Sequence, residues 1–195
     1  MARPPEFDRR DAVDAALHLF WEQGYNATSL SQLLEVMAIN RSSFYAAFRD
    51  KRSLFIEVLE LFARRTRDIL EQVDASDDPL GAIRHFFEVT LFEVPARRAR
   101  RGCLLVNTVL ESAYLDDELS RLSAERLAEM ERAFERCFRR AIDAGQIDAR
   151  QDPAKLAGFI MTLNQGLRVA SRKMQTRREL DDILTTGLSL LPIAV

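Results

Sequence analysis

The sequence predicts an all-α fold of about nine helices, and three observations carry that prediction. Apolar residues recur at i, i+3, i+4 and i+7 along most of the chain, which is the spacing of an amphipathic helix. No segment alternates apolar and polar residues over the length of a strand. Asp78-Pro79 and Asp152-Pro153 each combine an N-cap residue with a first-turn proline, as helices often begin. A chain of 195 residues that is 47% hydrophobic and 30% charged can bury a substantial core.

Three short helices are predicted in the N-terminal part of the chain. The first has an apolar face centred on Leu17 and ends at Gly24. Thr28 is the predicted N-cap of the second helix. Asn40 is the predicted N-cap of the third, which runs over residues 41–48.

Longer helices follow. Asp50 is predicted to cap a helix that continues through Val73, and the next helix runs from Pro79 to about Val94. Residues 95–102, a proline followed by a basic run and a glycine, are predicted to form a loop. The remaining helices are predicted over residues 103–114, 117–144, 153–173 and 178–191. We expect two domains, residues 1–52 and 53–195.

The charge of the chain gives little support for nucleic-acid binding as a whole. The net charge is −2, and residues 1–52 hold seven Arg or Lys against seven Asp or Glu. Residues 40–52 differ, because they contain a single acidic residue, Asp50, and four basic ones, Arg41, Arg49, Lys51 and Arg52. Phosphate attraction is screened within about 8 Å at physiological salt, so a local cationic surplus matters more than the average.

The second and third predicted helices have the pattern of a helix-turn-helix. Apolar residues would give the two helices a common core that includes Phe44 and Phe48. The outward face of the third helix would then carry Arg41, Ser42, Ser43, Tyr45 and Ala46, with Arg41 suited to a guanine edge and Tyr45 to a phosphate. Phosphate contacts are also expected from Thr28, Ser29 and Ser31 at the start of the second helix and from Lys51.

The run from Phe20 to Leu30, FWEQGYNATSL, and the run from Ile39 to Phe55, INRSSFYAAFRDKRSLF, resemble the DNA-binding domain of the tetracycline-repressor (TetR) family. The resemblance covers about residues 8–56. It implies that Arg41, Ser42, Ser43 and Tyr45 contact operator bases or backbone, and that Thr28 and Lys51 contact phosphates. The family usually has glycine in the turn where this chain has Ala38, which can adopt the left-handed conformation at a cost of about 1 kcal/mol.

The second domain is expected to hold a pocket for a small apolar or amphipathic effector, as the TetR resemblance implies. Polar residues embedded in apolar helix faces support a pocket, because burying unpaired polar groups is costly. No cofactor or metal is expected. The candidate pocket residues are Phe62, Phe86, Phe87, Cys103, Asn107, Thr108, Glu111, Phe134, Phe138, Phe159, Thr162 and Gln165.

The last two helices are expected to form a dimer interface. The resemblance implies a four-helix bundle with a second copy, and a homodimer could read two half-sites of a palindromic double-stranded operator about 34–36 Å apart. The candidate interface residues are Leu156, Phe159, Ile160, Leu163, Leu167, Leu180, Ile183, Leu184 and Leu188.

These features predict a repressor that an effector releases from DNA, and three alternatives stay open. The same DNA-binding role could be regulated by oxidation of Cys103 or Cys137. A helical protein-interaction module is a second alternative. A helical enzyme is a third, but no catalytic or metal-binding constellation is visible. The polar N-terminus and the lack of a long apolar run predict a cytoplasmic protein without membrane contact.

Overall fold

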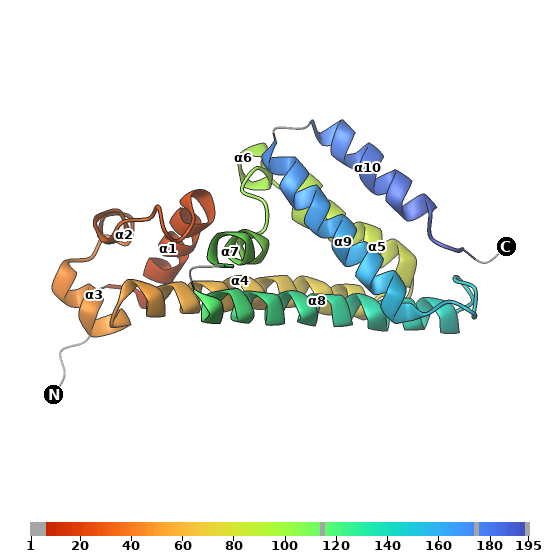
Figure 1. Cartoon of the computed structure of the whole chain (residues 1–195), viewed down its shortest axis with the longest axis horizontal. Helices are drawn as coiled ribbons and strands as arrows, with labels where there is room; N and C mark the ends of the chain where they lie inside the picture. The colour runs from red at the N-terminus through yellow and green to blue at the C-terminus, as the bar shows by residue number, and fades with distance from the viewer. Residues whose placement is uncertain (1–6, 114–115, 174–175, 194–195) are drawn as a thin grey trace.

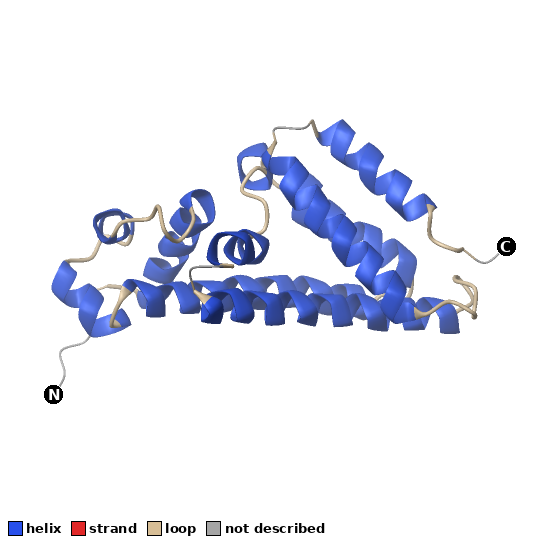
Figure 2. Cartoon of the chain, viewed as in Figure 1, coloured by secondary structure: helices blue, strands red, loops and turns tan. Residues whose placement is uncertain are grey.

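The computed structural model describes residues 7–113, 116–173 and 176–193, and its regular elements are helices (Figure 2). The predicted all-α fold is confirmed. In chain order the elements are α1 (Arg9–Gln23), α2 (Leu30–Val36), α3 (Arg41–Phe48), α4 (Lys51–Asp74), α5 (Pro79–Phe87), the π-helix η1 (Glu88–Phe92), α6 (Ala96–Ala99), α7 (Leu104–Ser112), α8 (Asp117–Asp143), α9 (Pro153–Arg172) and α10 (Arg177–Ser189).

The helices are arranged around α4 (Figure 1). α1, α2 and α3 gather at one end of the molecule, around the start of α4, while α8 lies beside α4 over much of its length. α9 packs against α8, and α10 covers the outer side of α9. Because α4 begins at Lys51, the boundary expected between residues 52 and 53 falls in its first turn, and one continuous helix joins the two parts.

Side-chain caps fix where most helices begin. Asn40, Asp50, Asp78 and Asp152 accept hydrogen bonds from first-turn N–H groups, as predicted. The prediction for the second helix was wrong. Ser29, not Thr28, is the N-cap of α2, because its hydroxyl forms a reciprocal capping box with Gln32.

The turn between α2 and α3 has the left-handed residue that the sequence predicted. Ala38 has φ 53°, a conformation that costs an alanine about 1 kcal/mol relative to glycine. Behind the turn, Leu33, Phe44 and Phe48 are buried together, so α2 and α3 share a closed apolar core.

The region after α5 differs from the sequence prediction in two ways. The helix expected to run to about Val94 changes to π-helical geometry at Glu88 and ends at Phe92. The loop expected over residues 95–102 contains the short helix α6, because Pro95 is followed by a run of Ala and Arg, which are strong helix formers. The Tyr114 end of the next predicted helix lies outside the described residues.

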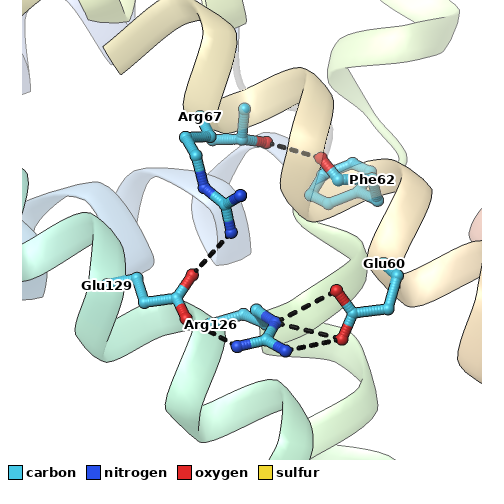
Figure 3. Close-up of polar contacts among 6 residues, drawn as sticks. Glu60, Phe62, Arg67, Arg126 and Glu129 are labelled. Carbon is cyan, nitrogen blue, oxygen red and sulfur yellow. Dashed lines mark hydrogen bonds and ion pairs between the residues drawn. The ribbon is translucent and has the colours of Figure 1, made fainter. Parts of the chain in front are cut away.

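Ion pairs hold α4 against α8 (Figure 3). Arg126 donates to both carboxylate oxygens of Glu60 and to Glu129, and Glu129 also accepts from Arg67. A hollow of about 330 Å³ lies beside this network, and three of its charged lining residues, Arg67, Arg126 and Glu129, pair with one another. In the described part of the chain, no helix is long and apolar enough to cross a membrane.

Candidate nucleic-acid interface and internal cavity

The exposed face of α3 carries the residues that the sequence assigned to base contact. Arg41, Ser42, Tyr45 and Ala46 are exposed, and Tyr45 retains 48% of its accessible surface. Ser43 is half-buried, and its backbone N–H donates to the Asn40 side chain at 2.8 Å. An exposed Arg, Ser and Tyr on a short, rigidly backed helix form a surface that fits the major groove of DNA.

The expected phosphate ligands at the start of α2 are not equivalent. Thr28 is fully buried and its hydroxyl donates to the carbonyl of Gly24 at 2.6 Å, so this hydroxyl does not reach the surface. That differs from its expected role as a phosphate contact. Ser29 and Ser31 are exposed at the N-terminus of α2, where the N–H groups of a helix favour an anion.

Lys51 lies half-buried in the first turn of α4. Its ammonium lies 4.5 Å from the centroid of the Tyr25 ring, within the range of a cation–π interaction. Partial burial lowers the pKa of Lys51 from its ordinary value. Lys51 therefore has an intramolecular partner, the Tyr25 ring, in addition to the phosphate contact that the sequence predicts for it.

A cavity of about 200 Å³ lies between α1, α4, the α5–η1 segment, α6 with the α6–α7 connection, α8 and α9. Three of the candidate pocket residues line it: Phe62, Phe86 and Cys103. The wall also contains residues that the sequence reasoning missed. They are Leu17, His18, Trp21, Arg65, Thr66, Ile69, Val89, Thr90, Arg98, Gly102, Met130, Asn164 and Arg168.

The other candidate pocket residues lie elsewhere. The Phe87, Phe134 and Phe138 side chains are fully buried in the core and do not line the cavity. Asn107 donates to the carbonyl of Arg101 at 2.9 Å, and Thr108 donates to that of Leu104 at 2.8 Å, so local backbone satisfies both side chains. The last three, which lie on α9 and do not line the cavity, are Phe159, Thr162 and Gln165.

Glu111 has a different partner from the expected effector. Its carboxylate accepts hydrogen bonds from the backbone N–H groups of Tyr25 at 3.0 Å and Asn26 at 2.6 Å, in the α1–α2 loop. Gly24 has φ +87°, and a Cβ built on it would lie 2.8 Å from the Glu111 carboxylate. Glycine is therefore needed at this position both for its backbone conformation and for the close approach of Glu111.

Trp21 and Glu22 join the α1 helix to α6 and the α6–α7 connection. The indole Nε1 of Trp21 donates to the carbonyl of Gly102 at 3.2 Å. Glu22 pairs with Arg97 and Arg101, in each case at 2.9 Å. The wall of the cavity is thus tied directly to a helix of the helix-turn-helix unit.

The outer face of α9 and α10 is apolar and partly exposed. The candidate interface residues divide into two groups. Ile160, Leu167, Leu180 and Leu184 are buried within the chain, which differs from the prediction that they lie in an interface with a partner. The half-buried or exposed group is Leu156, Phe159, Leu163, Ile183 and Leu188, and three of its members help to line a surface groove of about 330 Å³.

Two family models match the chain. "Bacterial regulatory proteins, tetR family" matches residues 12–58, and "Tetracyclin repressor-like, C-terminal domain" matches residues 79–186.

Among the described residues, no group of His, Cys, Asp and Glu is arranged to hold a metal ion.

Individual relatives are similar over nearly the whole chain. The HTH-type transcriptional repressor ComR of Escherichia coli strain K12 is 29% identical over 194 residues, which cover 97% of this chain and 91% of that protein. A solved structure of a cysteine-substituted variant of the TetR family transcriptional regulator CifR, complexed with 26bp double-strand operator DNA, is 32% identical with a TM-score of 0.85. That alignment covers 98% of this chain and 100% of the CifR chain.

A solved structure of regulatory protein TetR from Rhodobacter sphaeroides is 25% identical, has a TM-score of 0.85 and covers 93% of this chain and 97% of that one. The resemblance seen in the sequence is therefore confirmed over both parts of the molecule. The chain belongs to the TetR family and is a DNA-binding transcriptional regulator with a helix-turn-helix.

Proposed function

We propose that this regulator is a homodimeric repressor that binds a palindromic operator through α3 and is released when a small effector occupies the internal cavity. The exposed Arg41, Ser42 and Tyr45 on a buried apolar support are the observation that carries the DNA-binding part of the proposal. An Arg that pairs with a guanine edge contributes about 1–3 kcal/mol of discrimination, so one short helix gives only part of an operator's affinity. A second copy supplies the rest.

The apolar groove on α9 and α10 is the proposed contact between the two copies. Phe159 and Ile183 keep 40% and 39% of their accessible surface, and small Gly166 between them leaves room for close approach of another helix. Covering this surface with an identical one would give a two-fold dimer. The two α3 helices would then face successive major grooves about 34–36 Å apart.

The contacts between the cavity and the helix-turn-helix suggest how an effector acts. Trp21 and Gly102 both line the cavity and are hydrogen-bonded to each other, so a ligand that displaces one displaces the other. Glu111 lies further along α7 and holds the α1–α2 loop. An effector that favours a shifted α7 would change the orientation of α3, and the operator would favour the opposite state.

The redox alternative receives less support. Both cysteines are free and buried, and burial raises the pKa of the Cys103 thiol. Burial also raises the pKa of Cys137 to about 11, and its thiol donates to the carbonyl of Pro79 at 3.0 Å. Neutral thiols react slowly with oxidants because the thiolate is the nucleophile.

Selection from a random duplex library with the purified full chain tests the DNA-binding proposal. We expect enrichment of a palindrome whose two half-sites lie about one helical turn apart. Enrichment of a single half-site, or of no sequence, would contradict the proposed dimeric reading.

A further inference from the structure

The cavity contains a buried arginine that has no carboxylate partner. Arg168, on α9, is 8% exposed, and among the described residues its guanidinium bonds only to neutral groups. Nε donates to Asn164 Oδ1 at 3.2 Å, while Nη1 and Nη2 donate to the carbonyl and hydroxyl of Thr90 at 2.8 and 2.6 Å. A buried cation without a counter-charge is costly, so its presence beside a cavity calls for a functional reason.

Hydrogen-bond donors remain unused at this position. A guanidinium carries five N–H groups, and the three bonds of Arg168 leave two of them free for a ligand. Asn164 also lines the cavity, is 1% exposed, and its Nδ2 has no hydrogen-bond partner. The orientation of its amide is fixed, because Oδ1 accepts the bond from Arg168 and Nδ2 is therefore the free end.

The remaining ionisable groups of the cavity do not neutralise Arg168. The charged or titratable lining residues besides Cys103 are His18, Arg65, Arg98 and Arg168, and none is acidic. Arg65 is already paired with Asp14 at 2.7 Å, and the Arg98 guanidinium lies 5.7 Å from the Trp21 ring centroid. Burial raises the pKa of Cys103, so its thiol supplies no negative charge near neutral pH.

We propose that the effector is a small monocarboxylate, with its acid group bound by Arg168 and Asn164 and its apolar body held between Trp21, Phe62 and Phe86. This inference rests on the proposed role of the cavity as the effector site. A guanidinium matches the planar carboxylate, and the spare amide N–H of Asn164 adds a second kind of donor. The volume of about 200 Å³ lies below the usual range for drug-sized ligands, which limits the acid to a short chain or a single ring.

A matched set of probes separates the charge of a ligand from its shape. The acids are the straight-chain monocarboxylates from butanoate to nonanoate together with benzoate, phenylacetate and phenylpropanoate, and each has its primary amide as the neutral partner. Binding to the full chain is measured by titration calorimetry and thermal shift, and release is measured on an operator from the duplex selection. We expect at least one acid to bind at least about tenfold more tightly than its amide, because a hydrogen bond to a charged group is stronger than one to a neutral group.

Variants then place the acid at Arg168. Arg168→Met and Arg168→Gln should each lose the preference for acid over amide, while Arg172→Met, an exposed position on the same helix, should keep it.

Three outcomes overturn the inference: no acid binds, the amides bind as tightly as the acids, or the Arg168 variants keep the acid preference. The wild-type comparison of acid with amide decides the question even where a variant fails to fold. If the neutral amides also release the operator, the proposed function is retained and only the inference that the effector is a carboxylate is contradicted. If the unliganded chain binds no operator, the proposed function is contradicted. Calorimetry would still show whether the chain binds the acids more tightly than the amides.

Discussion

The carboxylate of Glu111, on α7, accepts a 2.6 Å hydrogen bond from the backbone N–H of Asn26 in the α1–α2 loop. The neighbouring N–H of Tyr25 donates to the same carboxylate at 3.0 Å. One side chain of the larger domain therefore satisfies two backbone donors of the helix-turn-helix unit. These bonds join α7, whose N-cap residue Cys103 lines the cavity, to the loop that precedes α2.

Replacing Glu111 by Ala should destabilise the fold. The N–H groups of half-buried Tyr25 and exposed Asn26 would lose a charged acceptor, and a loss of about 1 kcal/mol in the free energy of unfolding is expected. Glu111→Gln should cost less, because the amide oxygen can still accept. Urea unfolding measures both, with Glu93→Ala at an exposed position as the control. Equal stability of Glu111→Ala and the wild type would show that this contact is not a support.

Replacing Ala38 by Gly should stabilise the fold. Ala38 has φ 53°, which glycine adopts freely, so the gain is up to about 0.6 kcal/mol after the extra flexibility of the unfolded chain is subtracted from about 1 kcal/mol of strain. Ala154→Gly, in the first turn of α9 and exposed, should be neutral or destabilising, because glycine weakens a helix. The melting temperature of Ala38→Gly should therefore lie above that of Ala154→Gly, and a fall for Ala38→Gly below the wild type would refute the assigned turn.

The two thiols should be unreactive in the native protein. Burial raises the pKa of Cys103 and raises that of Cys137 to about 11, so both are protonated near pH 7. Their contribution to stability is fully present below the pKa of an unfolded thiol and is lost as the pH rises through the higher native values. Reaction with a disulfide reagent should be slow in buffer and fast in urea. Rapid modification of native Cys103 that also released the operator would instead favour redox control.

The apolar groove on α9 and α10 should be required for self-association. Phe159→Asp and Ile183→Asp place a charge at two exposed positions of that groove, so each should convert a dimer to a monomer. Leu110→Asp, on α7 and 69% exposed, is the control and should stay dimeric. Light scattering on a sizing column measures the mass. Dimers of unchanged mass in both groove variants would place the interface elsewhere.

The fold could be predicted from the sequence because its signals are local. Asn40, Asp50, Asp78 and Asp152 cap helices by bonding to N–H groups two or three residues away, so their positions are readable without knowledge of packing. The π-helical turn at Glu88 could not be read in the same way. The Thr90 hydroxyl in that turn donates to the carbonyl of Phe86 on α5 and accepts from Arg168 on α9, so part of its environment comes from a helix far away in the sequence.

The cavity was harder to predict than the DNA-binding face. The face is defined by a single short helix, whereas the cavity is assembled from six separated segments. One signal was present on α9: Asn164 and Arg168 share the side of the helix that contains buried Ile160. The predicted pocket residues Thr162 and Gln165 lie on the other side of α9. Two polar groups four residues apart among buried apolar ones were the better guide.

The central claim is that the exposed face of α3 reads a specific operator. Fluorescence anisotropy of a labelled palindromic duplex, taken from the selection and compared with a scrambled duplex, tests it most directly. We expect Arg41→Ala to weaken operator binding by at least about tenfold while changing the weak binding to scrambled DNA much less, since a base contact is worth about 1–3 kcal/mol. Arg139→Ala, an exposed arginine on α8, should bind like the wild type. Operator binding by Arg41→Ala that equals the wild type would contradict the account.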